Sequence, residues 1–126
     1  MDELGEEFAR CAKWLQAALD HAGGSHTLED VEEGVRNGTL FFWPGEKSAA
    51  ITEVIEYPRK RVFHIFLAGG DLEELSIMEE SATAFAKHLG CQGMSIAGRR
   101  GWVKAFKDKG YKEYLTTVIK PLEVDE

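Results

Sequence analysis

The sequence predicts one α/β domain whose sheet mixes antiparallel and parallel strands. Its 126 residues suit a single hydrophobic core, so we treat residues 1–126 as one domain. The apolar run at 62–68 indicates a strand covered on both faces, and a glycine pair and a helical pattern follow it directly. Several β-prone stretches precede this run, and connections of a few residues join them, which is typical of antiparallel hairpins.

Two helices are expected at the N-terminal end. Residues 3–22 place their apolar side chains on one stripe at three- and four-residue steps, and a glycine pair follows them. A shorter helix begins at Thr27, with Asp30 three residues later as the partner in a capping box. The pair Asn37-Gly38 marks its end.

Three strands are expected next. The first, residues 39–43, is aromatic and β-prone, and the second spans residues 48–57. The apolar run 62–68 is the third. Turn signals at 44–45 and 58–60 separate them, so the three strands should be antiparallel neighbours.

A long helix should follow the third strand. Asp71 and Glu74 have capping-box spacing, apolar residues recur along one face as far as position 89, and Gly90 stops the pattern. Residues 91–97 then form a fourth strand. Because the helix is a crossover connection, this strand should lie parallel to the third.

The remaining chain predicts a short helix and a final strand. Residues 102–106 mark the helix, which Gly110 terminates, and residues 111–120 form the strand, which Pro121 ends. The predicted order is therefore α-α-β-β-β-α-β-α-β.

Composition and charge exclude several classes of function. The formal net charge of −7 argues against general binding to nucleic acid or to anionic membranes. The acidic N-terminus lacks the basic start and apolar stretch of a signal peptide, and no apolar run approaches the roughly 18 residues of a membrane span. Cys11 and Cys91 are expected to be reduced thiols in a cytoplasmic protein.

This element order resembles the GNAT superfamily of acetyl-CoA-dependent N-acetyltransferases over residues 3–120. The best local matches are residues 62–90 and the segment 102–111, which resembles the family's A-x-x-F-Y-E-K-L-G-F region. The family's usual first strand is missing, because this chain starts in a helix. Residues 51–70 and the G-R-R-G-W at 98–102 are similar to small GNAT-like proteins of tailed bacteriophages and prophages.

The resemblance implies a cofactor turn after the third strand, with the pattern R/Q-x-x-G-x-G/A. Gly69 and Gly70 match it, but the basic residue is missing, and Asp71, Glu73 and Glu74 place three carboxylates at the helix start. These carboxylates interact favourably with the positive end of the helix dipole and occupy the free N–H groups of the first helical turn. At ~5 Å and an effective dielectric near 20, each pair with a diphosphate costs about 3 kcal/mol before screening. The turn is therefore expected to repel the cofactor.

The resemblance also implies a tyrosine that protonates the leaving thiolate. Phe106 stands at that position and has no proton to give. Tyr111 and Tyr114 lie downstream and could compensate only in a different geometry. We therefore expect no catalytic residue and no cofactor.

An alternative is a divergent acetyltransferase that binds acetyl-CoA through strand backbone and a pair of arginines. For these two arginines, ion pairs with the acidic turn or plain solvation are favoured over an anion-binding role, because such surface pairs are common. Under the alternative, the cofactor-binding residues are Ile65, Phe66, Leu67, Gly69, Gly70, Arg99 and Arg100.

No metal site is expected, because the four histidines show no ligand spacing on one element. The main hypothesis is a GNAT-fold protein of phage or prophage origin that has lost acetyl transfer and acts as a structural or accessory protein-binding domain. Its partners would be proteins, either phage structural proteins or a second copy that covers an exposed sheet edge, in the host cytoplasm or the virion. A sensor of a small ligand in the same crevice is a third, weaker alternative.

Overall fold

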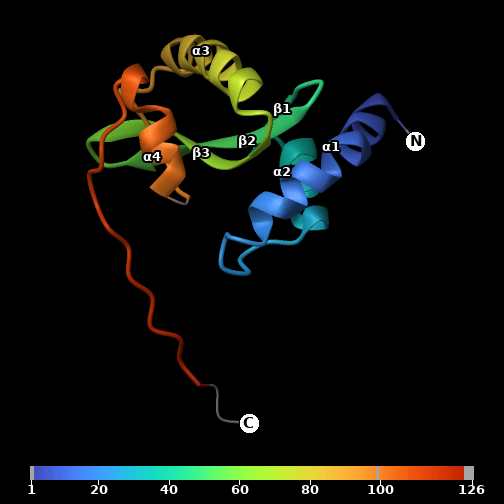
Figure 1. Ribbon diagram of the computed structural model, residues 1–126, viewed down its shortest axis with the longest axis horizontal. Helices are drawn as coiled ribbons and strands as arrows, with labels where there is room; N and C mark the ends of the chain where they lie inside the picture. Colours follow the sequence, from blue (N-terminus) through green and yellow to red (C-terminus); the bar gives the residue numbers. More distant parts are fainter. Residues whose placement is uncertain (1, 99, 124–126) are drawn as a thin grey trace.

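The computed structural model describes residues 2–98 and 100–123, without the side chains of Arg100 and Val103. A four-stranded sheet lies at the centre, with α1 and α2 packed on one face and α3 on the other (Figure 1). Among the described residues, no helix combines the length and apolar character needed to cross a membrane. The elements are α1 (Glu3–Leu19), α2 (Leu28–Asn37), β1 (Phe41–Pro44), β2 (Ser48–Tyr57), β3 (Lys60–Gly70), α3 (Leu72–His88), β4 (Gly93–Ile96), α4 (Arg100–Ala105) and the 3₁₀ helix η1 (Lys107–Lys109).

The strand order β1-β2-β3-β4 confirms the mixed sheet predicted from sequence. β1, β2 and β3 form antiparallel hairpins, and β4 lies parallel to β3 after the α3 crossover. One irregularity was not predicted. Ile51 pairs with Leu67 and Thr52 pairs with Ile65, so Phe66 has no partner on β2 and forms a β-bulge.

The predicted helix starts are confirmed by their caps. Thr27 and Asp30 form the reciprocal capping box of α2. Asp71 accepts a hydrogen bond from the backbone N–H of Glu74 at 2.9 Å and caps α3. The first helix is three residues shorter than predicted, because residues 20–24 turn away from the helix axis.

The hydrophobic core is divided by the sheet. On one face, Cys11 and Leu15 of α1 pack against Ile51 and Leu67. On the other face, Phe63 packs against small side chains of α3. Side chains of β2 and β3 thus alternate between two helical layers, which explains why their sequences are apolar at successive positions.

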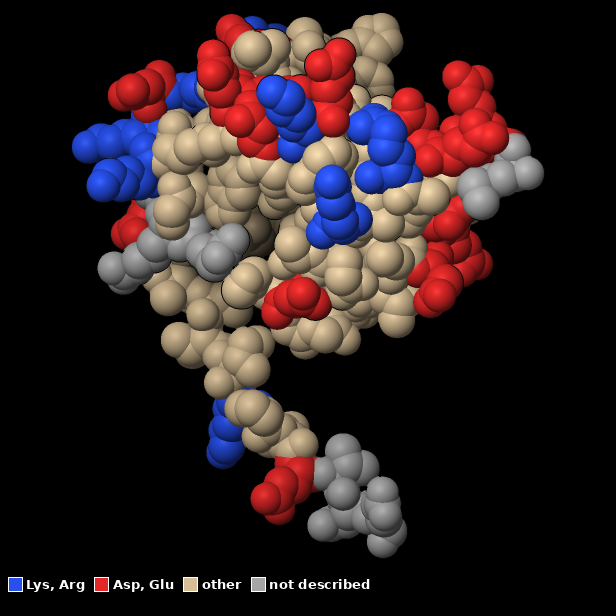
Figure 2. Space-filling model, turned by 45° about the vertical axis from the view of Figure 1, so that its right-hand side comes forward, with Lys and Arg blue, Asp and Glu red and all other residues tan. Residues whose placement is uncertain are grey.

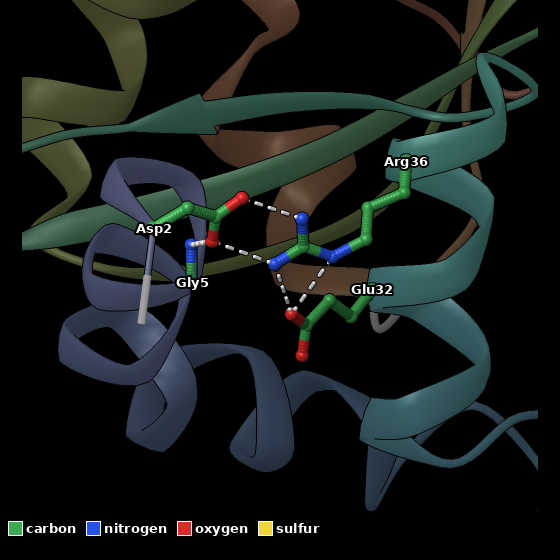
Figure 3. A network of polar contacts seen from close by, with 4 residues as sticks. All are labelled: Asp2, Gly5, Glu32 and Arg36. Atoms are coloured by element: carbon green, nitrogen blue, oxygen red, sulfur yellow. Dashed lines mark hydrogen bonds and ion pairs between the residues drawn. The ribbon is translucent and has the colours of Figure 1, made fainter.

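An ion-pair network joins the two N-terminal helices (Figure 3). Asp2 caps α1 by accepting a hydrogen bond from the N–H of Gly5 at 2.9 Å. The guanidinium of Arg36 donates to both carboxylate oxygens of Asp2, at 2.8 and 3.0 Å, and also to Glu32. One arginine therefore links the start of α1 to the last turn of α2.

The Asp2 carboxyl is expected to remain ionised at an unusually low pH. Hydrogen bonds from Arg36 and then from Gly5 hold its pKa well below the usual range. Since the folded-state pKa is lowered, the stabilisation is present above the unfolded pKa of about 4 and is lost as pH falls. An NMR titration of the Asp2 carboxyl measures this shift.

Arg36→Ala should return the titration midpoint of the Asp2 carboxyl towards the ordinary value of an aspartate. The matched variant Arg10→Ala, which removes the separate Arg10–Glu7 pair of α1, should leave it unchanged. Equal Asp2 midpoints in the wild type and in Arg36→Ala would contradict the network.

The predicted final strand at 111–120 is wrong. Residues 111–123 have no regular secondary structure, and after Tyr111, which packs against Phe106, the chain runs away from the domain (Figure 1). The β propensity of this segment is real, but a strand also needs backbone partners on a neighbouring strand. None of the described strands pairs with it.

Candidate functional site

The site lies where β3 and β4 part. The two strands pair from Val62↔Gly93 to Ile65↔Ile96, and β4 then ends while β3 continues to Gly70. Aromatic side chains of the α4–η1 segment approach the opening from the α3 side of the sheet. We call this space the β3–β4 crevice. In α/β proteins the ends of parallel strands are the usual place for a ligand.

The β3–β4 crevice is largely filled by the chain itself. Trp102 and Phe106 stack with ring centroids 5.5 Å apart and an interplanar angle of 5°, and Phe106 is only 3% exposed. The centre of a water-sized sphere can move within about 30 Å³, room for about two water molecules. The lining residues are Trp43, Ala50, Thr52, Ile65, Ala68, Leu75, Met78, Glu79, Ala82, Ile96, Trp102 and Phe106.

Glu79 is the charged group in the wall of this crevice, and it is only 8% exposed. It accepts hydrogen bonds from the Tyr111 hydroxyl at 2.8 Å and from the Thr83 hydroxyl at 3.0 Å. The ammonium of Lys109 lies 3.7 Å away. A carboxylate held by these groups is a satisfied buried charge, not a free base.

Glu79 was not predicted as a site residue from the sequence. The sequence feature that could have identified Glu79 is its place on the apolar stripe of α3, four residues after Leu75 and three before Ala82. A charged residue within an apolar stripe requires buried partners. In this structure Tyr111 and Thr83 are among them.

The glycines of the turn before α3 have a packing explanation. A Cβ on Gly69 would lie 2.5 Å from the carbonyl oxygen of Trp14 in α1. Gly70 has φ +106°, and a Cβ there would lie 2.6 Å from the Cα of Ser48. The glycines allow β3 to pass close to α1 and to the β1–β2 turn. The same residues in a cofactor turn would instead leave room for a ligand.

The start of α3 is occupied by the chain's own polar groups. The N–H of Asp71 donates to the carbonyl of Lys47 at 3.0 Å, and the Asp71 carboxylate caps the N–H of Glu74. The Glu74 carboxylate accepts hydrogen bonds from the Ser48 hydroxyl and from the N–H of Lys47. These two bonds lower the pKa of Glu74. The predicted acidic turn is therefore present, and Glu74 is tied to the β1–β2 turn.

The proposed cofactor residues are only partly brought together. Ile65 lines the crevice, whereas Phe66 and Leu67 pack with the α1 and α2 layer. Their backbone lies beyond the point where β4 ends. Arg99 lies outside the described residues, and Arg100 begins α4 with a side chain that is not described.

Tyr111 and Tyr114 lie in different surroundings. Tyr111 lies beside Phe106 but donates its hydroxyl proton to Glu79, and burial together with this hydrogen bond raises its pKa. Tyr114 is exposed and does not line the crevice. His64 contacts the Ser95 hydroxyl at 2.7 Å, and burial lowers its pKa. Within residues 2–98 and 100–123, no three metal-ligating side chains come together.

No family model matches the chain. No curated protein sequence matches it either. Solved structures do match. The protein TTHA1254 of Thermus thermophilus is 14% identical, with a TM-score of 0.63 over 94% of this chain and 95% of that chain.

Two further structures have the same arrangement. A tetramutant of the BH1408 protein of Bacillus halodurans is 11% identical, with a TM-score of 0.65 over 93% of both chains. A Trypanosoma brucei acetyltransferase is 11% identical, with a TM-score of 0.61 over 87% of this chain and 94% of that chain. This chain has a GNAT-like fold. Likeness at such low identity establishes the GNAT-like fold only, because one fold hosts many functions.

Proposed function

We propose that this chain is a GNAT-like domain that does not transfer acetyl groups and acts by binding protein. The observation that carries the proposal is that the β3–β4 crevice and the adjoining turn are filled by the chain's own groups. Cofactor pockets usually offer about 300–1,000 Å³. In the β3–β4 crevice the centre of a water-sized sphere has only about 30 Å³ to move in, and Trp102 and Phe106 stack on each other in its wall.

The turn at α3 adds an electrostatic reason. A helix N-terminus binds phosphate when its N–H groups are free. Here the N–H of Asp71 and that of Glu74 already have partners, and the Glu74 carboxylate lies across the turn. An arriving diphosphate would meet these carboxylates at close range, without the basic residue that the family's pattern supplies.

Protein binding is favoured by the surface. Large apolar side chains near the C-terminus are exposed, and exposed apolar groups of this kind commonly mark interaction sites. The net charge of −7 disfavours nucleic acid as the partner. The role we propose is that of an accessory or structural component, consistent with the resemblance to small phage proteins.

The test is calorimetry and thermal unfolding with acetyl-CoA, alongside an assay for free thiol release. A true cofactor at 100 times its dissociation constant would stabilise the fold by about 2.7 kcal/mol. We expect no shift in Tm and no thiol release. A Tm that rises with acetyl-CoA, but not with adenosine as the control, would overturn the proposal.

One observation favours the divergent acetyltransferase as a second candidate. Beyond Ile65 the backbone of β3 has no β4 partner, so Phe66 and Leu67 leave backbone groups available to the amides of a pantetheine arm. For this candidate to act, Trp102 would have to move out of the crevice. Trp102→Ala should then give measurable acetyl-CoA binding, whereas under our proposal it gives none.

A further inference from the structure

The C-terminal tail, residues 112–122, exposes an unusual amount of apolar surface. Figure 2 shows it as a mostly uncharged arm that leaves the domain. Five of its large apolar side chains are between 78% and 86% exposed. They are Tyr114, Leu115, Val118, Ile119 and Leu122. A single exposed apolar side chain needs no explanation, but five large apolar side chains exposed within nine residues do.

The tail has the sequence of a strand. Residues 114–119 read Tyr-Leu-Thr-Thr-Val-Ile, an unbroken β-prone run that Pro121 closes. In an extended chain, alternate side chains point to opposite faces, so each face of this run carries two apolar residues and a threonine. Such a strand belongs in a sheet that is covered on both sides.

The path of the tail carries it past its own sheet. It leaves Tyr111, whose hydroxyl lies 3.7 Å from the sulfur of Met94 in β4. Three residues later the ring of Tyr114 faces the ammonium of Lys60, 5.6 Å from the ring centroid. Lys60 lies on β3 two residues before Val62, and Val62 pairs with Gly93, the first residue of β4. The tail thus runs opposite to β4 and beyond its first residue.

The outer edge of β4 is therefore left open. Among the described strands only β3 pairs with β4, so the backbone groups on its other side lack a strand partner. An open edge of this kind is a template for another strand. The chain's own tail leaves the domain near the turn between β2 and β3 (Figure 1), so it passes the first residue of β4 instead of covering the edge of that strand.

We propose that the tail of one copy pairs with the β4 edge of a second copy, and that the exchange is reciprocal. Each chain carries one donor strand and one acceptor edge, so two copies satisfy both and form a closed two-fold dimer. Backbone hydrogen bonds of the added strand provide the affinity. This inference rests on the proposed function because it names the protein partner, but it does not depend on whether acetyl-CoA binds.

Light scattering on the full chain tests the stoichiometry. We expect a mass of twice 14.1 kDa. The double variant Val118→Asp/Ile119→Asp should have half that mass, with the helical signal of its circular dichroism spectrum unchanged. Ile77→Asp is the matched control, because Ile77 is 62% exposed on α3, away from the tail, and this variant should remain dimeric.

Photo-crosslinking tests the exchange itself. A photoreactive residue at position 116, in an incubated mixture of isotopically light and heavy copies, should join the tail to residues 93–96 of the other copy. A monomeric full chain, a dimer that survives the double variant, or crosslinks confined to one copy would each overturn the inference. None of these outcomes alters the result of the acetyl-CoA titration, so the two proposals fail separately.

Discussion

Gly70→Ala is expected to lower the free energy of unfolding by about 2–4 kcal/mol. Gly70 has φ +106°, a backbone conformation that costs an alanine about 1–2 kcal/mol. Its new methyl group would also lie 2.6 Å from the Cα of Ser48 and would push the β1–β2 turn away from β3. Urea denaturation in the absence of any ligand measures the effect.

Gly93→Ala is the control for this prediction. Gly93 also lies in the sheet, but nothing lies within 4 Å of its added Cβ and its φ is not positive. We expect it to change stability by less than about 1 kcal/mol. Equal stabilities of Gly70→Ala and the wild type would refute the packing explanation and would return the glycine to the role of a cofactor turn.

Tyr111→Phe is expected to cost about 1–3 kcal/mol at neutral pH, because it removes a donor from the buried Glu79 carboxylate. The ring remains, so packing against Phe106 is retained. The variant therefore separates the hydrogen bond from the hydrophobic contact. Chemical denaturation at about pH 7 gives the size of the loss.

The same pair gives a prediction at high pH. Burial, followed by the hydrogen bond to Glu79, raises the pKa of Tyr111, whereas an unfolded tyrosine ionises near pH 10. A raised folded-state pKa gives stability that is complete below about pH 10 and is lost as pH rises further. The wild type should therefore lose more stability than Tyr111→Phe as the pH rises from about 10 to 11.

Tyr57→Phe is the matched control for the tyrosine prediction. Tyr57 is exposed at the end of β2, and no described residue holds its hydroxyl in a hydrogen bond. Removal of this hydroxyl should leave the stability at neutral pH unchanged. If Tyr111→Phe behaves in the same way, the Glu79 contact is not formed in solution.

The sequence was most informative where the controlling physics is local. The capping residues Thr27 and Asp71 lie within three residues of the N–H groups that they satisfy, so their pattern alone located two helix starts. The parallel pairing of β4 followed from chain connectivity, because a crossover helix leaves few alternatives. The acidic turn before α3 could also be predicted directly from the sequence.

The sequence was least informative where distant segments meet. Gly69 appeared to be part of a cofactor turn until its contact with Trp14, 55 positions earlier in the chain, gave it a packing reason. Glu79 acquired a partner in Tyr111, 32 residues away. Neither contact leaves a local pattern, so neither could be predicted.

Short-range hydrogen bonding and apolar periodicity set the helices, the strand order and the charge of the turn, so these features could be predicted from the residues alone. Two features became visible only in the folded molecule: Trp102 and Phe106 line and narrow the β3–β4 crevice, and residues 111–120 pair with none of the described strands. Both outcomes depend on where a segment lies in space after the rest has folded. The β-propensity of a segment does not determine whether another strand lies beside it, nor how tightly side chains pack in a crevice.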